Sequence, residues 1–322
     1  MELRSPRFKQ IASTGIILLA AIIWGLCFVA QRSAMQHIGP FLFNGIRGFL
    51  AAFALLLIVA LVWYITLKRK APTRASAPPV SMKYLIGAGL FCGVILFFAS
   101  NLQQIGMVTV TASKAAFITA LYIVLVPVLG LFLKQRTNWN TWVSVGVAVV
   151  GLYLLCVSSG FALETGDAVL IGCALFWAFH ILAIGHYAPR LTLLQLFGMC
   201  VIQFVFSGAL SLVCAPLFDG FFFAVPLTLG AVMNAAPELL YAGILSTGVA
   251  FTLVAIAQRH AKPTPAAIVM STESVFGLLG GVLILSEVLT AREGIGCLLM
   301  FAAVILTQLK PQEPSELSWK SQ

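Results

Sequence analysis

Two full charges lie deep inside otherwise apolar stretches of this chain, where they could bind an ion or a charged solute. Arg47 and Glu273 each stand seven residues from one end of their stretch, which is roughly 10 Å along a helix. A charge at the middle of a bilayer costs about 2.5 to 3.5 kcal/mol, so both side chains should face protein or water rather than lipid. Their depths differ by roughly 10 Å, so a direct ion pair requires both side chains to be extended.

Each of these charges has a functional and a structural interpretation. Glu273 is predicted to be a cavity carboxylate that binds a substrate ammonium group, or a proton that competes with it. The alternative is that Arg47 snorkels, or that the two charges form a pair that only packs helices.

Aromatic and polar side chains share single helix stripes at two places. Gln31 follows Trp24 by seven residues, and His180 follows Trp177 by three. Such a stacking wall with polar tips suits a small organic solute, and His180 could relay protons near neutral pH. A histidine held by an ordinary interhelical hydrogen bond is the alternative.

Amides and one lysine complete the candidates from the first half of the chain. Asn44 lies about one turn before Arg47, and Asn101 and Gln104 lie one turn apart. Buried amides often join helices, so contact with substrate and helix packing both stay open for these three residues. Lys114, at the outer end of its stretch, is either a gate or a lysine that snorkels to the headgroups.

The motifs of ATP hydrolysis, metal binding and intramembrane catalysis do not occur. The chain has no G-x-x-x-x-G-K-[ST], H-E-x-x-H, C-x-x-C or G-x-S-x-G. Its seven cysteines are odd in number and lie in apolar stretches, as small buried hydrophobes do. No metal, no cofactor and no enzymatic activity are therefore expected, and work on solutes must be driven by gradients.

The composition is that of a polytopic membrane protein. Hydrophobic residues make up 61% and charged residues 9% of the 322 positions, which is too little polar surface for a soluble core of this size. Stretches near the roughly 20 residues that span a bilayer recur ten times. They are Ile11–Ala34, Pro40–Leu67, Leu85–Gln104, Ala115–Leu133, Trp142–Ser159, Ala168–Tyr187, Leu193–Ala215, Leu239–Ala257, Ala266–Leu285 and Gly294–Leu309.

Basic residues orient these spans. With the N-terminus in the cytoplasm, fifteen of the nineteen Lys and Arg residues lie inside, three lie outside (Arg32, Lys114 and Arg292) and Arg47 lies within a span. This bias predicts an inner (plasma) membrane protein with cytoplasmic tails at residues 1–10 and 310–322. The net charge of +9 then reflects contact with membrane lipids rather than nucleic acid. The protein is expected to act as a monomer or a dimer.

The chain is built from two repeats, residues 11–159 and 168–309. Trp24 recurs as Trp177, 153 residues later, and the Ala115-Ala116 pair recurs as Ala266-Ala267, 151 residues later. Each repeat holds five spans, and because five is odd the second repeat must run through the membrane upside down. Two inverted five-helix repeats are the architecture of secondary transporters.

The shift of 151 residues pairs Glu273 with Tyr122. Thr119 precedes Tyr122 by one turn, as Met270 precedes Glu273, so each pair shares a helix face. The repeat should place both faces on one cavity from opposite sides of the midplane. A tyrosine that only packs is the alternative for Tyr122.

Several motifs in order resemble the EamA-type family of the drug/metabolite transporter superfamily. In the first repeat they are Trp24-Gly25, Gln104–Met107, Thr111–Thr119 and Val126–Leu129; in the second they are Pro263–Ala267, Thr272–Phe276, Leu285–Glu287, Gly294 and Gly296. The resemblance covers about residues 12–309. It departs at Glu273-Ser274, which no proline closely follows, whereas Pro127 remains in the fourth span as a candidate hinge.

The resemblance implies an exporter of an amino acid, nucleoside, related metabolite or drug-like amphiphile. It also implies a cavity between the halves, chiefly among the third, fourth, eighth and ninth helices. The acidic residue there favours zwitterions or cations. We therefore expect a secondary transporter that exports or exchanges a small metabolite by alternating access. An intramembrane enzyme acting on lipid-linked substrates and a non-transporting scaffold are the rival hypotheses.

Overall fold

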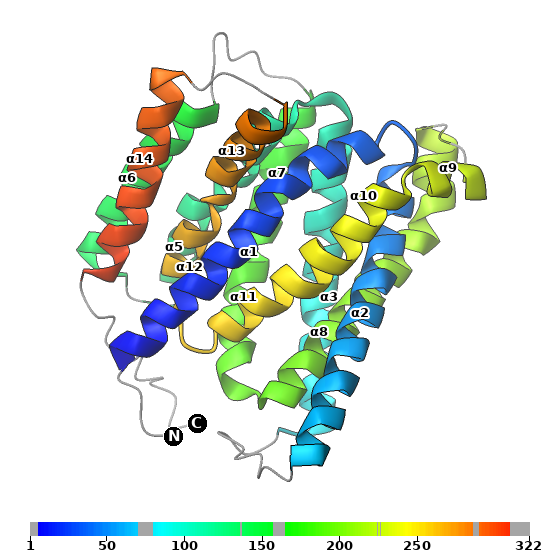
Figure 1. Cartoon of the computed structure of the whole chain (residues 1–322), viewed down its shortest axis with the longest axis horizontal. Helices are drawn as coiled ribbons and strands as arrows, with labels where there is room; N and C mark the ends of the chain where they lie inside the picture. Colours follow the sequence, from blue (N-terminus) through cyan, green and yellow to red (C-terminus); the bar gives the residue numbers. More distant parts are fainter. Residues whose placement is uncertain are drawn as a thin grey trace.

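The protein is a bundle of helices that run between the same two ends of the molecule (Figure 1). This computed structural model describes residues 6–69, 80–135, 137–156, 165–223, 225, 227–285 and 290–309, and these contain no strand. The first half holds α1 (Pro6–Ala34), α2 (Pro40–Arg69), α3 (Met82–Thr109), α4 (Ala112–Thr119), α5 (Tyr122–Phe132) and α6 (Trp139–Cys156). The second half holds α7 (Thr165–Tyr187), η1 (Ala188–Arg190), α8 (Leu193–Ala215), η2 (Pro216–Phe222), α9 (Leu229–Asn234), α10 (Ala236–Leu240), η3 (Tyr241–Ala250), α11 (Phe251–Ala257), α12 (Pro263–Met270), α13 (Glu273–Leu285) and α14 (Ala291–Gln308).

The predicted fold class, an all-α polytopic membrane protein, is confirmed. Eight helical segments of the described chain are long and apolar enough to cross a membrane. The fifth expected span is the shorter apolar helix α6, and the ninth is assembled from α12 and α13. The end of the fifth span at 157–159, the Ser286-Glu287 motif and the tail at 310–322 lie outside the described residues.

The fourth and ninth spans break at corresponding points. Both pairs of half-helices are separated by two residues, which are Ala120-Leu121 and Ser271-Thr272. At each break the amides bond to carbonyls three residues back, as from Leu121 N to Ile118 O at 3.2 Å and from Thr272 N to Val269 O at 3.2 Å. The turn is thereby tightened to a 3₁₀ geometry. Tyr122 and Glu273 are therefore the first residues of α5 and α13.

Pro127 lies inside α5, beyond the point where the fourth span breaks. Its ring removes the hydrogen bond to the carbonyl four residues back, at Ile123, which is already past the break. In the ninth span the hydroxyls of Ser271 and Thr272 bond to Ile268 O at 2.8 Å and to Val269 O at 2.7 Å. The same break thus forms there without a proline in the half-helix that follows it, and the expected Pro127 hinge does not coincide with the kink.

The two halves interlock through equivalent contacts. Helix α1 packs against η3, α11 and α13 of the second half, and α7 packs against α3, α4 and α5 of the first. Helix α2 pairs with α8, and α6 pairs with α14 at one edge of the bundle (Figure 1). This is the packing of an inverted repeat with a pseudo-two-fold axis in the membrane plane.

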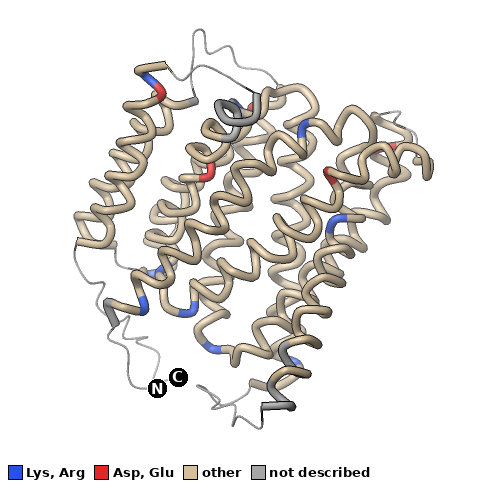
Figure 2. The backbone as a smooth tube through the Cα atoms, viewed as in Figure 1, with Lys and Arg blue, Asp and Glu red and all other residues tan. Residues whose placement is uncertain are grey.

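The charges divide between the two ends of the bundle. Figure 2 shows Lys and Arg gathered mostly at the end where α1 begins and α14 ends, with Asp and Glu toward the other end. We refer to these as the basic end and the acidic end. The split agrees with the charge bias read from the sequence.

A glycine allows the backbones of α1 and α13 to approach each other closely. A Cβ atom on Gly25 of α1 would lie 2.6 Å from both Glu273 O and Gly277 N of α13. These are backbone atoms, which cannot move aside as a flexible side chain can. The α1–α13 contact therefore requires glycine at this position.

We expect Gly25→Ala to destabilise the detergent-purified protein by about 1 to 3 kcal/mol, because overpacking forces the two backbones apart. The matched control is Gly15→Ala on the same helix, where an added Cβ meets nothing within 4 Å. That change should be neutral or stabilise by up to about 1 kcal/mol. Thermal unfolding, monitored by tryptophan fluorescence, measures the stability of both variants. Equal melting temperatures of Gly25→Ala and Gly15→Ala would contradict a tight contact between α1 and α13.

Candidate functional site

A cavity lies between the two halves and receives side chains from seven of the ten spans. It holds about 640 Å³ of space between its atoms, counting the part open to solvent. Nine of the twelve expected binding residues line it: Trp24, Gln31, Arg47, Thr119, Tyr122, Trp177, His180, Met270 and Glu273. The lining is completed by Phe28, Gln103, Ile181, Ile184, Ser246, Phe251, Val254 and Gln258.

The acidic side of the cavity is formed where the two broken spans meet. The Tyr122 hydroxyl donates a hydrogen bond to Glu273 Oε1 at 3.2 Å, so the residues paired by the repeat are in direct contact. Glu273 is 5% exposed and is the first residue of α13, directly after the break in the ninth span. The buried Thr119 hydroxyl has no hydrogen-bond partner among the described residues. A cation or an ammonium group would find a carboxylate and a free hydroxyl here.

The basic side of the cavity is Arg47. Its Nη1 donates to Gln31 Oε1 at 3.3 Å, and its guanidinium carbon lies 5.7 Å from the centre of the Phe43 ring. Arg47 and Glu273 do not form an ion pair; each contacts a neutral partner instead, as their difference in depth allows. A guanidinium has five donors in a planar fork, so the remaining donors can receive a carboxylate.

A row of amides connects Arg47 to the sixth span. Gln31 Oε1 also accepts from Gln103 Nε2 at 3.5 Å, and Gln103 Oε1 accepts from Trp177 Nε1 at 2.8 Å. These bonds join α2, α1, α3 and α7 in turn. The row therefore fixes the orientation of Gln31, the hydrogen-bond partner of Arg47.

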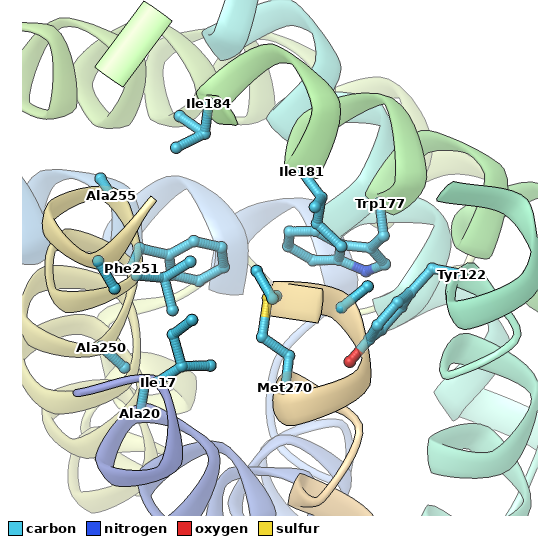
Figure 3. Close-up of a cluster of buried hydrophobic side chains, with 14 of the residues drawn as sticks. Ile17, Ala20, Tyr122, Trp177, Ile181, Ile184, Ala250, Phe251, Ala255 and Met270 are labelled. Carbon is cyan, nitrogen blue, oxygen red and sulfur yellow. The ribbon is translucent and has the colours of Figure 1, made fainter. Parts of the chain in front are cut away.

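Aromatic rings form the apolar wall. Trp24 Nε1 donates to Ser246 O in η3 at 3.0 Å, which frees its ring face for packing. The ring of Phe251 lies 4.9 Å from that of Trp24 and 5.5 Å from that of Trp177. Figure 3 shows Trp177, Phe251, Met270 and Tyr122 converging from different helices. His180 bonds through Nε2 to Gln203 Oε1 at 3.0 Å, the interhelical bond considered as the alternative to a proton relay.

Three expected binding residues lie outside the cavity lining and join helices instead. Asn44 Nδ2 donates to Asn101 Oδ1 and to Ser100 O, both at 3.0 Å. Asn101 Nδ2 donates to Ser211 Oγ at 2.8 Å, and Gln104 Nε2 donates to Gln31 O at 3.0 Å. Of the two interpretations left open for these amides, these contacts favour helix packing: all three bond to neighbouring helices.

The Lys114 gate candidate forms an ion pair at the acidic end. Lys114 Nζ lies 2.8 Å from Asp167 Oδ2, joining α4 to the start of α7. Asp167 is 1% exposed, so the pair is largely shielded from solvent. Lys114 does not line the cavity; it joins the fourth span to the sixth. No cluster of three or more His, Cys, Asp or Glu residues suited to a metal occurs in the described chain.

Sequence reasoning missed eight lining residues, and some of them carried a usable signal. Phe28 lies on the stripe from Trp24 to Gln31, and Ile181 and Ile184 continue the stripe from Trp177. Helical periodicity alone could have added these three. Ser246, Phe251, Val254 and Gln258 carried no such signal, since no residue of the eighth span had been singled out from which a stripe could be followed.

Comparison with known proteins gives the family. The model of the EamA-like transporter family matches the chain twice, over residues 13–157 and 164–309. An uncharacterized transporter of Archaeoglobus fulgidus is 30% identical over 297 residues, which is 91% of this chain and 85% of the relative. A probable amino-acid metabolite efflux pump of Salmonella typhimurium is 22% identical over 306 residues, covering 90% and 93% of the two chains.

The fold also has a counterpart among solved structures. A protein of known crystal structure matches with a TM-score of 0.71 at 17% identity, covering 92% of this chain and 98% of the other. With both repeats matched, the chain belongs to the EamA-like transporter family, and it is a membrane transporter of the drug/metabolite type.

Proposed function

We propose that this transporter exports or exchanges a small zwitterionic metabolite, such as an amino acid, by alternating access and without ATP. The observation that carries the proposal is that Arg47 and Glu273 line one cavity without neutralising each other. A substrate carboxylate would bind the free donors of Arg47. A substrate ammonium group would bind Glu273 and the Thr119 hydroxyl.

Contacts at the two ends of the cavity support a mechanism of alternating closure. At the acidic end, the Lys114–Asp167 pair and the bond from Ser33 Oγ to Glu238 Oε1 at 2.8 Å join helices of opposite halves. At the basic end, Gln258 Nε2 donates to Ile181 O at 3.1 Å and joins the end of α11 to α7 within the second half. The two 3₁₀ breaks lie between these ends, where half-helices can bend without losing their own hydrogen bonds.

Two further observations bear on the direction of transport and on the membrane in which the protein lies. The Salmonella relative is named as an efflux pump, which favours outward movement. The bias of basic residues favours an inner membrane protein with the basic end in the cytoplasm. We propose that the unit of function is one chain, with membrane lipids around it and no enzymatic activity.

The first prediction concerns Glu273→Gln. If the carboxylate holds the substrate ammonium, zwitterions that raise the melting temperature of the wild type should act more strongly as the pH rises and Glu273 loses its proton. The Gln variant should lose this pH dependence and bind about ten- to a hundredfold more weakly, the range for a lost hydrogen bond to a charged group. Thermal stabilisation against an amino acid panel at two pH values measures this.

The matched control is Glu293→Gln, which neutralises an acid at the start of α14, outside the cavity lining, and keeps a residue that can complete the capping box there. It should keep the wild-type response to ligand and pH. An undiminished, pH-dependent response in Glu273→Gln would show that the binding site is wrongly assigned. If no amino acid of the panel raises the melting temperature of the wild type, the proposal of a zwitterionic substrate is wrong and lipid-linked substrates are favoured.

The second prediction concerns Arg47→Gln, which removes the carboxylate-binding fork and keeps an amide beside Gln31. Affinity for an amino acid should fall about ten- to a hundredfold. Affinity for the matching amine without a carboxylate should change little. Isothermal titration with L-alanine and with ethylamine tests this, and equal losses for both ligands would contradict a carboxylate role for Arg47.

The third prediction concerns topology. Alkaline phosphatase fused after Leu309 should be inactive in bacterial cells, and green fluorescent protein fused there should fluoresce, because α14 ends at the basic end that we place in the cytoplasm. A phosphatase fusion after Thr228, the N-cap of α9 at the acidic end, should be active and serves as the control. The reverse pattern would invert the orientation.

A further inference from the structure

Phe251 occupies the space between the two tryptophans that the repeats place on either side of the cavity. Its ring meets Trp24 edge-on at 4.9 Å and stacks on Trp177 at 5.5 Å with 26° between the ring planes. It also lies 5.9 Å from His180. Trp24 and Trp177 are left 7% and 8% exposed, so little indole surface remains for a ligand. Figure 3 shows the Phe251 ring facing that of Trp177.

The corresponding phenylalanine of the first half does not lie in the cavity. Gly243, Phe251 and Gln258 stand 154 residues after Gly89, Phe97 and Gln104, which makes Phe97 the counterpart of Phe251. The Phe97 ring lies 6.2 Å from that of Phe41 and 5.2 Å from that of Phe98, and Phe97 is not among the lining residues. The aromatic filling of the cavity is therefore one-sided.

The backbone before Phe251 accounts for this asymmetry. Helix α3 is a regular α-helix up to and beyond Phe97, whereas η3 is a π-helix over Tyr241–Ala250 and ends directly before Phe251. A π-helix bonds five residues back instead of four, so it changes the angle at which the next side chain leaves the helix. The π-helical segment thus turns the Phe251 ring toward the tryptophans.

We propose that Phe251 determines specificity: it fills an aromatic subsite between Trp24 and Trp177 and thereby restricts the cavity to zwitterions with small, non-aromatic side chains. This inference rests on the proposed zwitterion function. Ile181, Ile184 and Val254 also line the cavity, beside Arg47 and Glu273. These aliphatic side chains suit a substrate with a small, non-aromatic side chain, which supports the proposed restriction. An aromatic side chain would have to displace the ring that already stacks there.

The test is Phe251→Ala, with L-alanine, L-phenylalanine and benzyl alcohol as probes of thermal stabilisation and of binding by titration. Wild type should bind L-alanine more tightly than L-phenylalanine and should not respond to benzyl alcohol. The variant should bind L-phenylalanine about tenfold more tightly than wild type, since a stacked aromatic pair adds up to about 1.5 kcal/mol. Benzyl alcohol should stabilise the variant alone, because an engineered apolar cavity of about 150 Å³ accepts benzene.

The matched control is Phe97→Ala, which removes the counterpart ring outside the cavity. It should lower stability without changing the preference between L-alanine and L-phenylalanine. If Phe251→Ala does not fold, Phe251→Leu keeps most of the apolar volume and should show a smaller shift in the same direction.

Wild type that binds L-phenylalanine as tightly as L-alanine would overturn this inference and leave the zwitterion proposal intact. A folded Phe251→Ala variant that gains no affinity for either aromatic probe would also overturn it. If no amino acid binds either protein, the zwitterion proposal fails. In that case, a benzyl alcohol response confined to the variant would still support the aromatic subsite.

Discussion

A lipid bilayer offers a buried polar group no water, and this constraint shapes the interior of the transporter. Asn44, Asn101 and Gln104 meet it by bonding across helices, which holds the first, second, third and seventh spans together. The two charges inside the spans instead face a cavity. Arg47 and Glu273 each keep one neutral partner, and their remaining capacity for bonds is available to a solute. The two charges that lipid would exclude are therefore both placed at the cavity, where a solute can bind them.

The inverted repeat places these groups but does not make the two sides alike. The breaks in the fourth and ninth spans coincide in position, although the nearest proline follows the break in one half (Pro127) and precedes it in the other (Pro265). At equivalent sites the two halves then present different chemistry, with a phenol from Tyr122 and a carboxylate from Glu273. The π-helical η3 adds a second asymmetry by turning Phe251 inward. A symmetric scaffold thus carries a site with distinct poles, as an asymmetric solute requires.

The sequence predicted the fold and much of the candidate site because lipid makes apolar length and charge bias strong signals. The repeat shift alone paired Tyr122 with Glu273, and in the structure the Tyr122 hydroxyl lies 3.2 Å from Glu273 Oε1. Sequence could not separate Gln103 from Gln104, because neighbouring residues differ only in the direction they face, and that depends on helix rotation within the bundle. Phe251 was hidden for a related reason. A π-helical turn is a backbone feature that an apolar run does not reveal.

The interlocking of the halves has a consequence for biosynthesis. A ribosome adding 5 to 20 residues per second needs roughly 10 to 45 seconds to proceed from Arg47 to Glu273, so α1 waits in the membrane before its partner α13 exists. The hydrogen-bond partners are nevertheless made in a safe order. Gln31 precedes Arg47, and Tyr122 precedes Glu273. Each charge therefore enters the membrane after the group that receives it, so the nascent chain need never hold either charge with its partner still unmade.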